Sequence, residues 1–248
     1  MLRINEEHLK KFERIKKHFL SKTKVPKENN WKLWTNNEIW LHLITQVIVV
    51  GGSAPAEKFE RNPKLQNVVS YEKMVKIDDK KELEETINGV LRAVGTRYAS
   101  SDISKCRKTR ALVHNLGIMK SFKDGPKGLL ERLSEFEGIS GDKRRIKYLM
   151  KIFRFVQSKS ARDYLMELGL VRNAIALDVR IQNVLKEVGI EIPKGLENSP
   201  ELYDSIEQDI LTQICKPLGL SGIEFDRMLY QNYKEIMEML NSERHDIR

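Results

Sequence analysis

The pattern of hydrophobic and polar positions is helical along nearly the whole chain. In residues 4–20, apolar side chains recur every three or four positions, at Leu9, Phe12, Ile15 and Phe19. This spacing places them on one face of a helix, with Lys and Glu residues on the opposite face. No long stretch alternates between apolar and polar residues, as a half-buried strand would. The pattern therefore predicts an all-α protein.

Capping and terminating residues predict where the helices begin and end. Thr35 followed by Glu38 is a capping box that opens a strongly apolar helix from 36 to about 50. The brief apolar run over 47–50 is better explained as the core of this helix than as a strand. The same signals predict further helices from Asp102 to Leu116, from Pro126 to Phe136, from Asp178 to Gly189 and from Ser221 onward.

The charge of the chain favours an anionic partner. The 248 residues include 44 Lys and Arg against 35 Asp and Glu, which gives a formal net charge of +9. Nucleic acid is the first candidate, because each Lys or Arg that neutralises a phosphate releases counterions. A basic protein without such a partner fits the charge alone about as well.

The composition argues against metal sites and membrane spans. Cys106 and Cys215 are isolated, and the five His residues are scattered without ligand spacing, so we expect no metal. No segment is long and apolar enough to span a membrane, and the N-terminus does not resemble a signal peptide. We therefore expect an intracellular, cytoplasmic protein.

A lysine and an aspartate stand 19 positions apart in a distinctive context. Lys159 opens residues 159–165, which have the pattern of the first turns of a helix, and Asp178 lies where a short loop gives way to the next helix. Each residue also has a simpler explanation. Lys159 could be a solvated surface lysine, and Asp178 could cap the helix that begins at Val179.

The order of motifs around this pair resembles that of a known family. A basic segment at 105–111 precedes an apolar helix at 146–150, which leads to Lys159 and Asp178, and an acidic and aromatic helix follows at 223–230. This order is similar to the helix-hairpin-helix DNA glycosylases with lyase activity, most closely the archaeal type-2 8-oxoguanine DNA glycosylases. The resemblance covers roughly residues 36 to 236.

The resemblance implies a two-lobed, all-α helix-hairpin-helix glycosylase fold. We expect one lobe to combine 1–99 with 200–248 and the other, which bears the hairpin, to span 100–199. The implied partner is double-stranded DNA that contains a damaged base or an abasic site, and the implied protein is a monomer.

The resemblance also implies a chemistry. Lys159 would attack C1′ of a flipped-out nucleotide and displace the base. The displaced base would be an oxidised purine, and we expect 8-oxoguanine. Asp178 would stabilise the cationic transition state. The resulting Schiff base would permit β-elimination, so the protein would be both a DNA N-glycosylase and an abasic-site lyase that needs no cofactor.

The expected DNA-binding hairpin departs from the family pattern, which usually reads apolar-x-Gly-apolar-Gly-x-Lys. Here Phe155 and Gln157 replace the two glycines. Glycines tolerate unusual backbone angles and let amide N–H groups approach a phosphate closely. We therefore expect another hairpin shape or weaker phosphate binding, and an ordinary helix–helix connection is the alternative. The expected hairpin residues are Arg154, Phe155, Val156, Gln157 and Ser158.

Four residues are expected near the damaged base. Phe225, Asp226 and Tyr230 lie on the helix that lines the base pocket in the family, and Gln46 lies where family members place a polar side chain that contacts DNA. Two other functions remain open from the sequence. One is a non-catalytic DNA-binding descendant of the fold, favoured by the lost glycines. The other is a basic helical module that binds RNA or protein.

Overall fold

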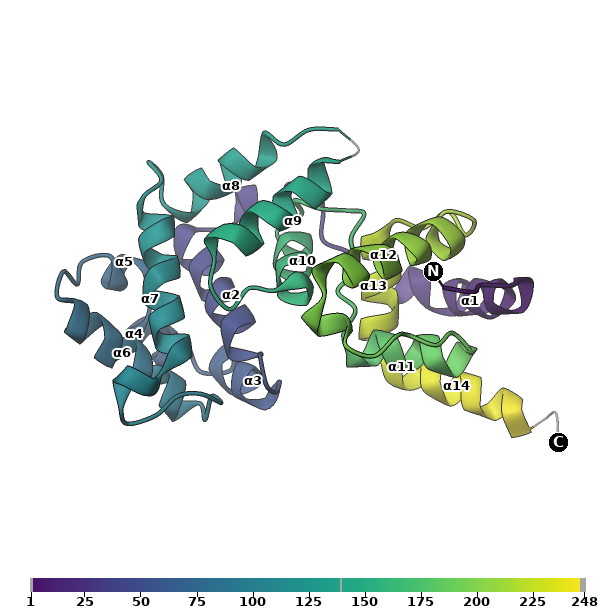
Figure 1. Cartoon of the computed structure of the whole chain (residues 1–248), viewed down its shortest axis with the longest axis horizontal. Helices are drawn as coiled ribbons and strands as arrows, with labels where there is room; N and C mark the ends of the chain where they lie inside the picture. Colours follow the sequence, from purple (N-terminus) through teal and green to yellow (C-terminus); the bar gives the residue numbers. More distant parts are fainter. Residues whose placement is uncertain (1, 139, 246–248) are drawn as a thin grey trace. The chain divides into compact units, whose positions relative to one another are not determined.

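The computed structural model describes residues 2–138 and 140–245, and every regular element within them is a helix (Figure 1). The prediction of an all-α protein is confirmed. The chain forms two compact units: unit 1 consists of Met1–Glu28 and Val171–Arg248, and unit 2 of Asn29–Leu170. Within the described ranges, no helix combines the length and the apolar character that crossing a membrane requires.

Unit 2 is built around α2 (Asn36–Ile48). Thr35 and Glu38 form the predicted capping box, in which the Thr35 N–H donates to the Glu38 carboxylate at 2.6 Å. Most apolar residues of α2 are buried, and Trp40 donates its indole N–H to the carbonyl of Val69 at 2.8 Å. The helices that pack against α2 are α3 (Ala54–Glu60), α5 (Tyr71–Met74), α7 (Arg107–Lys120), α8 (Pro126–Ser134) and α10 (Ser158–Glu167).

Two further helices of unit 2 pack on these neighbours: α6 (Lys80–Ala93) lies against α7, and α9 (Gly141–Ile152) lies against α10. The predicted helix from Asp102 begins five residues later, at Arg107, because Asp102 caps a separate 3-10 turn by accepting the N–H of Ser104 at 3.1 Å. The short elements of the unit are η2 (Asn30–Leu33), α4 (Pro63–Val68) and η3 (Ile103–Lys105).

Unit 1 has its own hydrophobic core. The predicted apolar face of α1 (Glu6–Phe19) is buried, and the ring of Phe12 lies 5.4 Å from that of Phe225. Short turns accompany the longer helices at η1 (Leu20–Lys22), η4 (Leu196–Asn198) and η5 (Leu211–Cys215). The other helices that contribute to this core are α11 (Val179–Val188), α12 (Pro200–Ile210), α13 (Gly222–Gln231) and α14 (Tyr233–His245).

The two units divide the chain differently from the expected lobes, which were 1–99 with 200–248 and 100–199. The reason lies in α2, which is apolar over most of its circumference and must be covered on several sides. It therefore gathers helices from both sides of position 100. Residues 171–199 instead share a core with α1 and the C-terminal helices.

Lys108 holds the end of α2. Its side chain is fully buried, and its ammonium group donates to the carbonyls of Ile48 at 2.9 Å and Val50 at 2.6 Å. Ile48 is the last residue of α2 and Val50 lies just beyond its C-cap, where carbonyls lack a partner within the helix. Burial, followed by the nearby charge of Arg97, lowers the pKa of Lys108 to about 8.

The lowered pKa of Lys108 predicts a pH dependence of stability. Between about pH 8 and about pH 10.5 the unfolded chain binds more protons than the folded one, so the free energy of unfolding should rise with pH. The Lys108→Met variant lacks this contribution. The difference between wild type and variant should therefore grow by on the order of 1 kcal/mol from about pH 7.5 to about pH 9.5.

Urea unfolding at the two pH values measures this difference, and Lys151→Met, at an exposed lysine, serves as the control. Parallel pH profiles for the wild type and Lys108→Met would show that Lys108 is not the titrating group.

Candidate functional site

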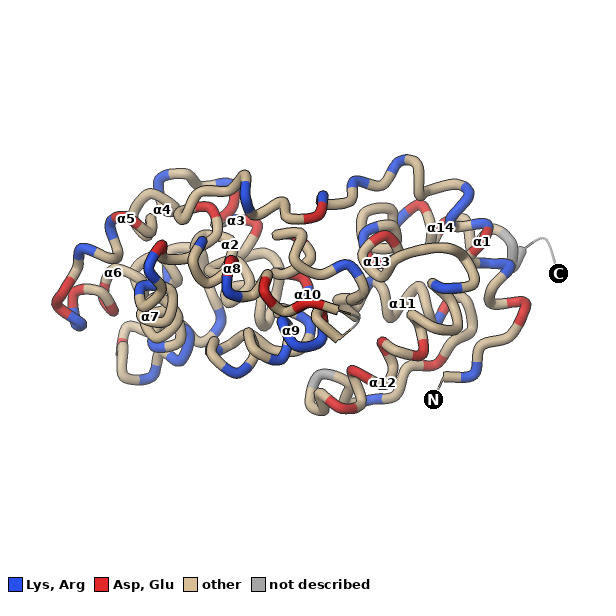
Figure 2. The backbone as a smooth tube through the Cα atoms, turned by 90° about the horizontal axis from the view of Figure 1, so that it is seen from above, with Lys and Arg blue, Asp and Glu red and all other residues tan. Residues whose placement is uncertain are grey.

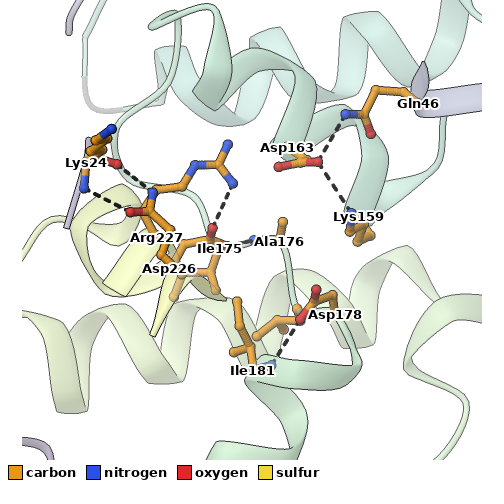
Figure 3. A network of polar contacts seen from close by, with 12 residues as sticks. Lys24, Gln46, Lys159, Asp163, Ile175, Ala176, Asp178, Ile181, Asp226 and Arg227 are labelled. Atoms are coloured by element: carbon orange, nitrogen blue, oxygen red, sulfur yellow. Dashed lines mark hydrogen bonds and ion pairs between the residues drawn. The ribbon is translucent and has the colours of Figure 1, made fainter. Parts of the chain in front are cut away.

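Lys159 lies in the first turn of α10, next to a carboxylate that the sequence reasoning overlooked. Its Nζ is 3.4 Å from Oδ2 of Asp163, one helical turn further on (Figure 3). The Lys159 side chain is 34% exposed and that of Asp163 is 21% exposed, so both side chains are partly shielded from water. The spacing of four residues on a predicted helix was the signal that could have revealed Asp163.

Gln46 belongs to the same cluster of polar side chains. It projects from α2, is almost fully buried, and donates from Nε2 to Oδ2 of Asp163 at 3.0 Å (Figure 3). Asp163 therefore accepts from both Gln46 and Lys159. The expected site residues Gln46 and Lys159 are brought together through this shared carboxylate rather than by direct contact.

Asp178 caps α11, as the sequence allowed. Its Oδ1 accepts the backbone N–H of Ile181 at 3.0 Å (Figure 3). The side chain is half-buried, and the cap leaves the second carboxylate oxygen with no further hydrogen bond among the described residues. A carboxylate held in this way has a fixed direction, because the helix start determines where its side chain lies.

The loop that delivers Asp178 is fixed by buried side chains of unit 1. Its three consecutive N–H groups at residues 175–177 each donate to a side chain from α12 or α13. The distances are 2.8 Å to Glu207, 2.6 Å to Asp226 and 2.6 Å to the hydroxyl of Tyr203. These side chains were not predicted to act on the loop. The residues in each contact are 26 to 50 positions apart in sequence, so no local sequence pattern predicts these hydrogen bonds.

The expected base-pocket residues on α13 have different surroundings. Phe225 is fully buried in the core of unit 1, and Asp226, which is 1% exposed, holds the loop backbone. Both therefore serve the packing of unit 1 and have no free surface for a base. Tyr230 is 39% exposed, and the guanidinium of Arg180 lies 4.6 Å from its ring centre. Only Tyr230 of the three presents an accessible aromatic face.

The turn between α9 and α10 keeps a left-handed residue where the family has a glycine. Phe155 has φ of +60°, although a side chain makes this conformation costly by about 1–2 kcal/mol. Asn115 of α7 fixes the preceding residue, because it accepts the N–H of Arg154 at 2.8 Å and donates to its carbonyl at 3.0 Å. Val156 and Ser158 are buried, whereas Gln157 is exposed. The lost glycine has therefore not removed the left-handed turn.

No group of three or more His, Cys, Asp or Glu side chains suited to a metal ion occurs in the part of the chain that the structure describes. The two cysteines, Cys106 and Cys215, are buried. The chemistry available at Lys159 and Asp178 is that of an amine and a carboxylate.

The fold is that of 8-oxoguanine DNA glycosylases of known structure. The enzyme of Thermotoga maritima superposes with a TM-score of 0.61 at 23% identity, over 91% of this chain and 95% of that one. The Methanocaldococcus jannaschii enzyme gives 0.62 at 20% identity, over 91% and 96%. The glycosylase/lyase of the same organism, in complex with a 15mer DNA containing 8-oxoguanine, gives 0.60 at 20% identity, over 90% and 94%. No protein-family model matches the sequence, and no curated protein does.

Proposed function

We propose that this protein is a DNA N-glycosylase and abasic-site lyase that acts on oxidised purine, with 8-oxoguanine as its lesion. The observation that carries the proposal is a partly exposed lysine in the first turn of the helix after a left-handed turn, in a chain with this fold. The basic charge of the chain supports DNA as the partner.

The proposed reaction begins with a nucleotide flipped out of the duplex, because its sugar carbon is unreachable in the stack. The neutral amine of Lys159 attacks C1′, the bond from C1′ to the base breaks, and the base leaves with the bonding electrons and takes up a proton. The carboxylate of Asp178 stabilises the positive charge that develops on the sugar. The sugar then opens to an imine with Lys159, which permits β-elimination of the 3′ phosphate.

Asp163 has a positioning role in this proposal. A lysine with an ordinary pKa near 10.4 is neutral in only about 0.04% of molecules at pH 7, and a neighbouring carboxylate favours the charged form further. The carboxylate of Asp163 thus fixes the direction of the amine and can accept its proton. The hydrogen bond from Gln46 holds the carboxylate in place.

A non-catalytic DNA-binding protein is the second candidate function. The side chains of Phe155 and Gln157, in place of glycines, favour it because they change how the turn can meet DNA. The two candidates differ in a simple assay. An enzyme cleaves a duplex that contains the lesion, whereas a binding protein retards the duplex without cutting it.

The first prediction from this proposal concerns the covalent intermediate. Borohydride reduces an imine to a stable amine, so it should trap the protein on duplex DNA that contains 8-oxoguanine or an abasic site. The adduct should disappear in Lys159→Gln, which keeps the length and polarity of the side chain without a nucleophile. Lys151→Gln, at an exposed lysine of α9, should trap like the wild type. An undiminished adduct from Lys159→Gln would assign the nucleophile elsewhere.

A second prediction separates base excision from strand cleavage. Asp178→Asn should slow base excision by two or more powers of ten, or about 2.7 kcal/mol and upward, because it removes the charge that stabilises the transition state. Cleavage at a preformed abasic site should suffer less, since no bond to a base remains to be broken. Asn caps a helix nearly as well as Asp, so the melting temperature should hardly change. Equal losses in both steps would argue against this role.

The third prediction concerns Asp163. In Asp163→Asn the amine of Lys159 loses a negatively charged neighbour. The neutral amine is therefore populated at lower pH than in the wild type. The rising limb of the pH–rate profile for adduct formation should shift toward acid. Single-turnover trapping across pH measures the shift, with Gln46→Glu as a variant that adds negative charge and should shift the limb the other way. A slower reaction with an unmoved profile would indicate a merely structural residue.

A further inference from the structure

The loop that leads to Asp178 is buried, although its backbone carries polar groups. The side chains of residues 174–177 are each 3% exposed or less. A buried backbone N–H group needs an acceptor, and α12 and α13 of the same unit supply acceptors to three consecutive groups. The path of the loop, and thus the place of Asp178 at its end, is therefore set by side chains that lie far from it in sequence.

The hydroxyl of Tyr203, on α12, contacts the loop twice. It accepts the N–H of Leu177 at 2.6 Å and donates to the carbonyl of Ile175 at 3.0 Å. The Tyr203 side chain is only 2% exposed, so both bonds are shielded from water. Leu177 directly precedes Asp178 in the chain. The hydroxyl thus fixes the backbone from which the Asp178 carboxylate projects.

Two buried carboxylates hold the neighbouring N–H groups. Glu207 accepts from Ile175 at 2.8 Å, and Asp226 accepts from Ala176 at 2.6 Å. Both carboxylate side chains are 1% exposed. Glu207 comes from α12 and Asp226 from α13, and both helices show acidic positions in Figure 2. Arg227, whose guanidinium lies 3.2 Å from Asp226, offsets part of its charge (Figure 3).

Two buried carboxylates are a costly way to hold a loop. Removing a carboxylate from water costs free energy that an ion pair or a hydrogen bond in the interior often fails to return. Backbone carbonyls or ordered water molecules would satisfy the same three N–H groups without burying a charge. Support of this kind is typical of residues that keep a reactive group in one geometry.

We propose that Tyr203, Glu207 and Asp226 are positioning residues for the carboxylate of Asp178 in base excision. They act through the backbone of 175–177 and not by contact with DNA. The carboxylate must face the charge that develops on the sugar, and a displacement of about 1 Å at a catalytic group can slow a reaction by on the order of 100-fold. This inference rests on the proposed function, because it assigns these residues to the step in which Asp178 acts.

The substitution Tyr203→Phe tests the inference, because it removes one oxygen atom and keeps the ring in the core. Base excision from a duplex with 8-oxoguanine should slow roughly tenfold in single-turnover assays. Cleavage at a preformed abasic site should change by less than about twofold, since no bond to a base remains to be broken. The matched control is Tyr233→Phe, which removes a hydroxyl bonded to Asn183 of α11 instead of to the loop. It should retain both rates.

Hydrogen exchange measures the loop without the reaction. The amides of 175–177 should exchange about tenfold faster in Tyr203→Phe than in the wild type, and those of α14 should be unchanged. Unchanged exchange in the loop, or equal losses of excision and abasic-site cleavage, would refute this inference while an active wild type leaves the proposed function intact. A wild-type protein that excises no base would instead refute the proposed function and, with it, this inference. The activity of the wild type therefore separates the two failures.

Discussion

The backbone of the loop before Asp178 needs buried acceptors, and the arrangement of unit 1 follows from that need. A buried N–H left without a partner costs about 1–3 kcal/mol. Three such groups in a row, at 175–177, are satisfied by Glu207, Asp226 and Tyr203. The loop also lies tightly against α13. A Cβ at Gly222 would come within 2.7 Å of the backbone of Ala174, so only glycine permits this approach.

In unit 2, side chains likewise fix the backbone that precedes a candidate site residue, Lys159. The turn before Lys159 contains a strained left-handed phenylalanine, which persists because the surrounding structure determines it. Asn115 secures the residue before it, and the side chains of Gln157 and Ser160 form a capping box that starts α10. Lys159 thus lies in the first turn of α10, and Asp178 is the N-cap of α11. Side chains fix the start of both helices. Such starts are rigid places from which to direct a reactive group.

Local signals in the sequence predicted where most helices begin and end. They predicted little of how the helices pack together. The capping boxes at Thr35 and Ser221 and the cap at Asp178 were all predicted and are all present, because a cap depends on residues three positions apart. The division of the chain into units differs from the expected lobes, because it depends on how many sides of α2 must be covered. Phe225 was assigned to a pocket by its place in the family pattern, but it lies in the core of unit 1 beside Phe12.

The central claim is that Lys159 forms the bond to the sugar, and mapping that bond tests it most directly. After borohydride reduction and nuclease digestion, the protein is cut with trypsin and analysed by mass spectrometry. Trypsin cuts after unmodified lysine, so a sugar on Lys159 should yield one peptide spanning 155–162 that carries the added sugar mass. We expect this modified peptide and the loss of the separate 155–159 fragment in proportion to trapping. A sugar found on another lysine, or on the terminal amine, would contradict it.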